Sequence, residues 1–127
     1  MKPLDGISVL LLEDEYLIAL DAEQILLGLG VRKIQTVNTL EEAARAAAAG
    51  DIDVAVLDLN INGQMSFELA ETLHRQGIPV VFATGYEMRS RNAREMPDAI
   101  YLTKPYTGEA LRDGMAAALE KRRRAAA

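Results

Sequence analysis

The sequence contains no cysteine, and that absence excludes several kinds of chemistry. Without cysteine the chain can form no disulfide, bind no zinc ion through thiolates and present no thiol nucleophile. Any covalent chemistry must therefore use oxygen atoms. Histidine is nearly absent too. His74 stands alone beside Arg75 and Gln76, which would not activate it, so we expect a surface residue rather than a phosphodonor.

Long hydrophobic runs and an excess of positive charge are also missing. The longest apolar runs, such as residues 7–12, are far too short to cross a bilayer, and the N-terminal residues lack the apolar stretch of a signal peptide. We therefore expect a cytoplasmic protein with no membrane partner. The net charge of −5 argues against nucleic-acid binding, and we interpret the run Arg122-Arg123-Arg124 as the solvated end of a helix.

What the sequence does contain is an alternation of short β-rich runs and longer helical patterns. With 127 residues, half of them apolar, the chain can build one sizeable core, so we expect a single domain over residues 1–127 and no effector domain within it. The alternation is typical of the α/β class, in which helical crossovers join parallel strands. The expected strands are residues 7–12, 34–37, 52–57, 80–83 and 99–102. The first and third are almost continuously apolar and should be central, whereas the second should lie at an edge.

The helical segments have recognisable boundaries. Thr39 and Glu42 form a capping-box pattern at the start of the second helix, and Ser66 and Thr107 should begin the third and last helices. The expected buried faces are Leu17, Ile18, Leu20, Ile25, Leu26 and Leu29 in the first helix, Phe67, Leu69, Ala70 and Leu73 in the third, and Leu111, Met115 and Leu119 in the last. Residues 86–98 have only a scattered apolar set, so a fourth helix there should be short or mobile.

Polar residues follow four of the expected strands at the point where each strand ends. They are Glu13, Asp14 and Glu15 after the first strand, Asp58 after the third, Thr84 after the fourth and Lys104 after the fifth. In an open parallel sheet, functional groups gather at the carboxyl ends of the strands, so these side chains should converge. Acids in this position can also merely cap the next helix, and we assign that role to Glu15 alone.

Three carboxylates in one place repel one another unless a cation lies between them. If the first and third strands are neighbours, Glu13, Asp14 and Asp58 crowd together, which raises a pKa or calls for a hard divalent ion. Oxygen ligands without cysteine or a nearby histidine suit Mg²⁺, and the backbone carbonyl of Asn60 could complete the ligand set. We therefore predict Mg²⁺ as the cofactor, held by these four residues.

The same group of residues predicts a phosphoacceptor. A carboxylate beside Mg²⁺ can attack phosphorus and form an acyl phosphate, and Asp58 is the best candidate for that nucleophile. Lys104 could pair its ammonium with a phosphoryl oxygen, and Pro105 could fix a cis peptide bond that directs the lysine inward. Thr84 could donate its hydroxyl to another phosphoryl oxygen, while Gly85 leaves the approach to the site open.

Four ordered segments of the chain carry a resemblance to a known family. They are Val9-Leu10-Leu11-Leu12-Glu13-Asp14-Glu15, Val56-Leu57-Asp58-Leu59-Asn60, Phe82-Ala83-Thr84-Gly85 and Tyr101-Leu102-Thr103-Lys104-Pro105. Each is weak by itself, but together they resemble the response regulator receiver (CheY-like) family of two-component signalling, over essentially the whole chain. The run Phe82-Ala83-Thr84-Gly85-Tyr86 also resembles the FAT GUY subclass, whose members are often single-domain and paired with unorthodox histidine kinases.

The resemblance implies a fold and a function. The fold is a flavodoxin-like, doubly wound sheet of five parallel strands in the order 2-1-3-4-5, with helices on both faces. The function is that of a stand-alone response regulator rather than an enzyme. It takes a phosphoryl group from a sensor histidine kinase or a histidine phosphotransferase onto Asp58, with Mg²⁺, and slowly hydrolyses it.

The resemblance also implies a conformational switch. Thr84 moves toward the phosphoryl group, and Tyr101 then turns inward. This remodels the face formed by the fourth helix, the fifth strand and the last helix, through which a monomer or a phosphorylation-linked dimer would bind a downstream protein. Alternatively, the protein relays the phosphoryl group or acts as a phosphate sink.

Three residues depart from the family pattern. Glu13 stands where the family usually has aspartate, Asn62 replaces a common proline four residues after Asp58, and Ser66 replaces a common glycine. The metal affinity and the stiffness of the loop after Asp58 should therefore differ from those of typical members.

Two other functions fit the sequence less well. A phosphatase or phosphotransferase of the haloacid-dehalogenase type would carry its nucleophile after the first strand in an Asp-x-Asp pattern, whereas Asp58 follows the third strand and is succeeded by Asn60. A flavodoxin-like binding module would need a hydroxyl-rich phosphate loop after the first strand, where Glu13, Asp14 and Glu15 would repel phosphate. The intact set of acids, hydroxyl and lysine also disfavours a pseudo-receiver that is not phosphorylated.

Overall fold

The protein is built around a five-stranded parallel sheet. A computed structural model describes residues 4–85 and 99–126, so the expected fourth helix at 86–98 lies outside the described residues. The strands are β1 (Ser8–Leu12), β2 (Lys33–Val37), β3 (Val54–Asp58), β6 (Val80–Thr84) and β7 (Ile100–Thr103). They pair in the order β2-β1-β3-β6-β7, which confirms the expected flavodoxin-like order.

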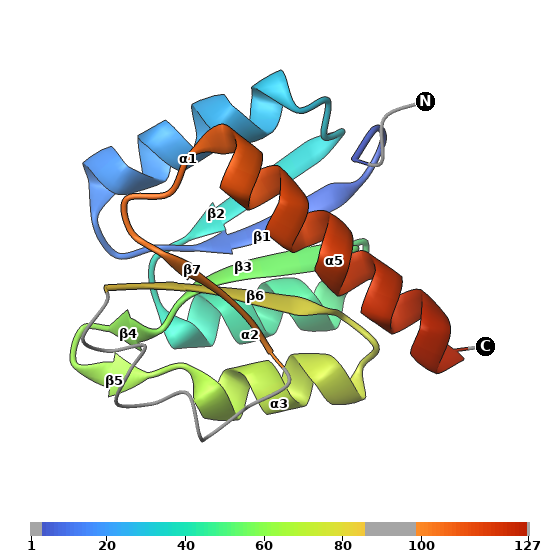
Figure 1. The fold of residues 1–127 in the computed structure, drawn as a ribbon. Helices are drawn as coiled ribbons and strands as arrows, with labels where there is room; N and C mark the ends of the chain where they lie inside the picture. The colour runs from blue at the N-terminus through green and yellow to red at the C-terminus, as the bar shows by residue number, and fades with distance from the viewer. Residues whose placement is uncertain (1–3, 86–98, 127) are drawn as a thin grey trace.

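Helices cover both faces of the sheet (Figure 1). They are α1 (Tyr16–Gly28) and α5 (Gly108–Ala126) on one face, and α2 (Leu40–Ala49) and α3 (Phe67–Arg75) on the other. Successive strand residues point to opposite faces, so Leu10 and Leu12 join the core under α2 and α3, while Val9 and Leu11 join the core under α1 and α5. Strands β1 and β3 lie inside the sheet and β2 at its edge, as the sequence predicts. Strand β1 is buried throughout, whereas two of the five residues of β2 are exposed.

The starts of α2 and α5 agree with the capping residues predicted from the sequence. The Glu42 N–H donates to the Thr39 hydroxyl at 3.1 Å, and the Ala110 N–H donates to the Thr107 hydroxyl at 3.0 Å. The second half of the expected capping box differs, because the Glu42 carboxylate accepts a hydrogen bond from the Thr39 hydroxyl instead of from a backbone N–H. The α5 residues Leu111 and Met115 are fully buried, as expected.

The expected buried face of α1 is partly wrong. Leu17 and Leu20 are 76% and 36% exposed, and the residues that pack fully into the core are Ala19, Ala22 and Leu26. Because α1 is apolar around most of its circumference, its sequence does not select one face. Burial falls instead on the small Ala19 and Ala22 and on Leu26, while Leu17 lies on the exposed side of the helix. Among the helices of the described residues, none is both long and apolar enough to cross a membrane.

A small hairpin follows β3 and was not predicted. Its strands β4 (Asn60–Ile61) and β5 (Gln64–Met65) are antiparallel and enclose the two-residue turn Asn62-Gly63. Asn62 has a φ of 52° and Gly63 a φ of 86°. Two successive positive φ angles define the type I′ turn that suits a two-residue hairpin, and Asn-Gly is its preferred sequence. The hairpin projects beside the carboxyl end of β6 (Figure 1).

Candidate functional site

The carboxyl ends of the central strands bring the expected polar residues together. Glu13 and Asp14 follow β1, Asp58 ends β3, Thr84 ends β6 and Lys104 follows β7. Since β1, β3, β6 and β7 are successive neighbours, these residues share one edge of the sheet. An open pocket of about 380 Å³ lies there, and its lining includes Asp14, Asp58, Thr84, Gly85 and Lys104.

The three acids lie close enough to share a metal ion. Glu13, Asp14 and Asp58 each offer a carboxylate oxygen, and these oxygens lie within 4.8 Å of one another. Asp14 and Asp58 line the open pocket, and a group of carboxylate oxygens with such access to water suits a hard cation that keeps part of its water shell, which describes Mg²⁺. The residues of the site therefore fit the metal expected from the sequence.

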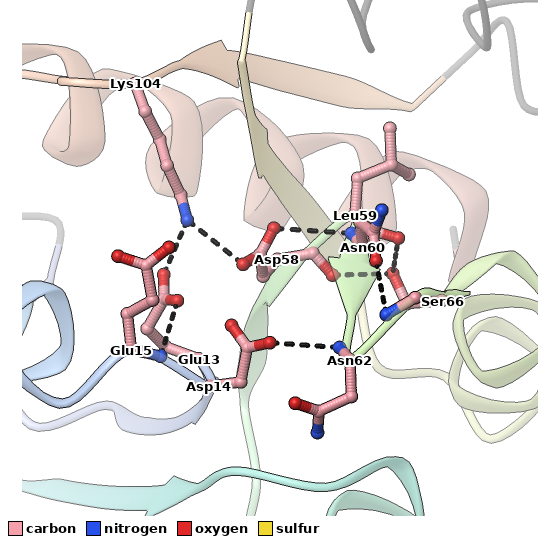
Figure 2. Close-up of polar contacts among 10 residues, drawn as sticks. Glu13, Asp14, Glu15, Asp58, Leu59, Asn60, Asn62, Ser66 and Lys104 are labelled. Carbon is pink, nitrogen blue, oxygen red and sulfur yellow. Dashed lines mark hydrogen bonds and ion pairs between the residues drawn. The ribbon is translucent and has the colours of Figure 1, made fainter.

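Lys104 binds two of these acids directly. Its Nζ lies 2.6 Å from Glu13 Oε1 and 3.1 Å from Asp58 Oδ2 (Figure 2), and the Lys104–Pro105 peptide bond is cis, as expected. The other oxygen of Glu13, Oε2, accepts a hydrogen bond from the Glu15 N–H at 3.1 Å. Glu13 is thus an ion-pair partner for Lys104 as well as a possible metal ligand.

Burial and charge shift the pKa values of this cluster. Burial raises the pKa of Asp58 from 3.8 to about 6; the Lys104 charge opposes that rise and the Glu13 charge adds to it. Burial alone would lower the pKa of Lys104, but its contacts with Glu13 and Asp58 raise it overall. At neutral pH the site therefore holds a charged lysine and carboxylates that repel one another, a state that a divalent cation would stabilise.

Backbone and side-chain hydrogen bonds fix the segment around Asp58. The Asn60 N–H donates to Asp58 Oδ1 at 3.3 Å, and the Ser66 hydroxyl, which is fully buried, donates to the Asp58 carbonyl at 2.8 Å. In an extended strand, the carbonyl of a residue points to the same side as its own N–H. This geometry is compatible with the predicted role of the Asn60 carbonyl as the fourth oxygen ligand.

The hairpin turn contacts the site from the other side. The Asn62 N–H donates to Asp14 Oδ2 at 2.9 Å (Figure 2), and the Gly63 N–H donates to the Asn60 side-chain oxygen at 2.9 Å. The sequence predicts an altered loop stiffness from Asn62 and Ser66, and a helix start at Ser66, but it does not reveal their contacts with Asp14 and Asp58. The Asn62-Gly63 dipeptide was the available signal, because it is a strong indicator of a short hairpin.

The remaining predicted residues lie as follows. Thr84 is buried at the wall of the pocket, and a side chain added at Gly85 would meet open space. Tyr101 is half-buried and stacks on Phe82 with ring centroids 5.2 Å apart. Glu15 occupies the position before α1, but its side chain makes no capping hydrogen bond, so its expected capping contact is not formed. His74 is exposed on α3, as expected.

The chain is similar in sequence to signalling proteins. Residues 9–121 match the model of the response regulator receiver domain. The phyllosphere-induced regulator PhyR of Methylorubrum extorquens is 30% identical over 102 residues, which cover 78% of this chain and 38% of PhyR. The sensory transduction protein LytT of Bacillus subtilis is 36% identical over 59 residues, which cover 45% of this chain and 24% of LytT. The matched region is thus well under half of either curated relative.

A solved structure matches the chain nearly end to end. The solution structure of SdrG from Sphingomonas melonis Fr1 is 38% identical, with a TM-score of 0.73, and the match covers 96% of this chain and 98% of that one. The similarity therefore includes the whole sheet and the segments after its strands that carry the acids, the hydroxyl and the lysine.

Proposed function

The chain belongs to the response regulator receiver domain family, and from that premise we propose that it accepts a phosphoryl group on Asp58 from a phosphohistidine, in the presence of Mg²⁺. The observation that carries the proposal is the cluster in which Lys104 contacts Asp58 while the oxygens of Glu13 and Asp14 lie within 4.8 Å of an Asp58 oxygen. A carboxylate, a cation beside it and a place for a metal ion are what acyl-phosphate formation requires.

The proposed reaction is a direct transfer between two proteins. A carboxylate oxygen of Asp58 attacks the phosphorus atom, the phosphorus–nitrogen bond to the donor imidazole breaks, and the imidazole leaves with the electron pair of that bond and takes up a proton. When bound, Mg²⁺ would neutralise charge on the oxygens of the transferring group. Hydrolysis of the acyl phosphate by water then returns Asp58 and inorganic phosphate.

Six further residues of the chain support this transfer to Asp58. Glu13, Asp14 and the carbonyl of Asn60, together with Asp58, are the proposed metal ligands. Lys104, which lies 3.1 Å from Asp58 Oδ2, pairs with one phosphoryl oxygen, and the hydroxyl of Thr84 donates to another. Gly85 adds no side chain to the mouth of the pocket and leaves the approach of the donor open.

We assign the 127 residues to one receiver domain of the FAT GUY type, and we assign its partners by the same reasoning. The phosphodonor is a sensor histidine kinase or a histidine phosphotransferase in the cytoplasm. The signal passes either through the surface of β7 and α5, with Tyr101 as the switch residue, or by relay of the phosphoryl group. Whether the phosphorylated chain acts as a monomer or a dimer is open to direct measurement of its mass in solution.

Mass spectrometry tests the phosphoacceptor directly. Acetyl phosphate with Mg²⁺ should add the mass of one phosphoryl group to the wild type and none to Asp58→Asn, and chelation of Mg²⁺ should abolish the addition. Asp53→Asn is the matched control, because Asp53 lies at the opposite end of β3 and its side chain accepts a hydrogen bond from the Ser8 N–H. Retained labelling of Asp58→Asn would refute the assignment.

The switch needs a separate test. Amide NMR during a titration with BeF₃⁻, which mimics a phosphoryl group, should shift resonances around Thr84, Tyr101 and Lys104. If the resonances around Thr84 and Lys104 shift while those around Tyr101 stay unchanged, Tyr101 is a static part of the core edge.

A further inference from the structure

The turn of the β4–β5 hairpin lies against the metal site and is built in one specific backbone conformation. Asn62 and Gly63 both have positive φ, 52° and 86°, and both line the pocket together with Asp14 and Asp58. The turn is exposed to solvent, so its conformation is not imposed by burial in the core. Its shape instead follows from the Asn-Gly sequence, which adopts the type I′ turn at the least steric cost.

The turn gives its hydrogen bond to one of the acids. The Asn62 N–H donates to Asp14 Oδ2 at 2.9 Å, which leaves the second carboxylate oxygen of Asp14 on the side of Glu13 and Asp58 (Figure 2). A free carboxylate rotates about its last bond, and a single N–H donor at this distance restricts that rotation. Donors of this kind orient metal ligands and influence metal affinity as strongly as many direct contacts.

The turn is itself fixed to the segment that carries Asp58. The Asn60 side chain accepts the Gly63 N–H at 2.9 Å, and the Asn60 N–H donates to Asp58 Oδ1 at 3.3 Å. A continuous series of hydrogen bonds therefore runs from Asp14 through the turn and Asn60 to Asp58. Two carboxylates that follow different strands are held in a fixed relation by one short hairpin.

We propose that the Asn62-Gly63 turn is a positioning element for the metal site, in which the Asn62 N–H orients the Asp14 carboxylate for Mg²⁺. The proposal rests on the proposed function, because it assumes that Asp14 is a metal ligand. Proline at position 62 would abolish this contact. Proline has no N–H to donate, and its ring holds φ near −65°, which the turn excludes.

Mg²⁺ affinity of the unphosphorylated protein, measured by titration calorimetry, tests the proposal. Asn62→Pro should weaken Mg²⁺ binding about 10- to 100-fold, the range typical when a metal ligand loses its hydrogen-bond partner. Asn62→Gly is the matched control, since it removes the same side chain but keeps the N–H and the positive φ, and it should bind Mg²⁺ like the wild type. Equal affinities of Asn62→Pro and Asn62→Gly would overturn the proposal.

Labelling kinetics separate positioning from general damage to the fold. If the turn acts only through Asp14, a high Mg²⁺ concentration should restore the acetyl phosphate labelling rate of Asn62→Pro to that of the wild type. A rate that stays low at saturating Mg²⁺ contradicts the proposal. Should Asn62→Pro fail to fold, amide NMR of the wild type decides. The Asn62 amide should shift during a Mg²⁺ titration in parallel with Asp14 and Asp58, and an unchanged Asn62 amide would count against the inference.

The outcomes also distinguish the inference from the function on which it rests. A wild-type protein that binds Mg²⁺ but is not labelled on Asp58 refutes the proposed function. A wild-type protein that is labelled on Asp58, combined with an Asn62→Pro variant of unchanged Mg²⁺ affinity, refutes the positioning role alone.

Discussion

Ion pairs lie at both ends of the central sheet, and they differ in how much water reaches them. At the carboxyl ends of the strands, Lys104 joins Glu13 and Asp58, and the three side chains are 19%, 4% and 12% exposed. At the amino ends, Arg32 and Lys33 pair with Asp51, and about half of each side chain is exposed. Exposed pairs contribute little to stability, whereas removing one partner of a buried pair leaves an uncompensated charge. The comparison indicates that removing a charged side chain should destabilise the fold most at the carboxyl ends of the strands, where the proposed site lies.

The largest difference between the two ends is expected when one positively charged side chain is removed at each. Lys104→Met should lower the free energy of unfolding by about 3 kcal/mol at neutral pH without Mg²⁺, because Glu13 is left buried without its partner. Arg32→Met, the matched change at the amino end, should cost less than about 1 kcal/mol. Urea denaturation followed by circular dichroism measures both, and equal losses would show that burial does not separate the two pairs.

The stability of the protein should depend on pH through the ionisation of Asp58. Its pKa is about 6 in the folded protein against 3.8 for an ordinary aspartate, so the folded state binds the proton more tightly. The resulting stabilisation is fully present below about pH 4 and is lost as the pH rises through about 6. The Asp58→Asn variant cannot ionise at this position. At neutral pH without Mg²⁺ its free energy of unfolding should therefore be higher than that of the wild type by about 1–2 kcal/mol, allowing for solvent screening.

Measurements over a range of pH provide the control for the Asp58 prediction. The stability difference between Asp58→Asn and the wild type should vanish toward pH 4 and should shrink at neutral pH when Mg²⁺ is added. A difference that stays constant across this range would mean that lost contacts, and not the carboxylate charge, separate the two proteins.

The smallest effect is expected for substitutions of two fully buried serines, which are also the most closely matched pair. Ser66 near the carboxyl end donates to the carbonyls of Asp58 and Leu59, whereas the hydroxyl of Ser8, at the start of β1, has no hydrogen-bond partner among the described residues. Ser66→Ala should lower the free energy of unfolding by about 1 kcal/mol, because it leaves these buried carbonyls with fewer hydrogen-bond donors. Ser8→Ala should be neutral or slightly stabilising in the same thermal denaturation experiment. The reverse order would contradict these hydrogen-bond assignments.

Much of the fold could be predicted because buried parallel strands leave a strong trace in the sequence. The run before Glu13 and the run before Asp58 are apolar on both faces, so both were recognised as central, and the acids after them could be assigned to one edge. The buried face of α1 could not be predicted, because apolar residues lie around most of the helix and its sequence does not single out the face formed by Ala19, Ala22 and Leu26.

The composition of the site could be predicted, but its internal contacts could not. The residue types and their places after the strands indicated a metal and a phosphoacceptor. The pairing of Lys104 with Glu13 joins residues 91 positions apart, a separation that no local sequence pattern reveals. The contact of Asn62 with Asp14 depends on a hairpin whose strands have two residues each, too short for any periodic pattern.

The two positive φ angles of the Asn62-Gly63 turn also bear on which substitutions the protein tolerates. Exposed positions usually accept most residues, because their side chains contact only water. Here the restriction lies in the backbone, since β-branched and bulky residues rarely adopt positive φ. A saturation mutagenesis scan scored by Mg²⁺ affinity should therefore find two solvent-facing positions as intolerant as the core, with glycine, asparagine and aspartate as the accepted residues at position 62.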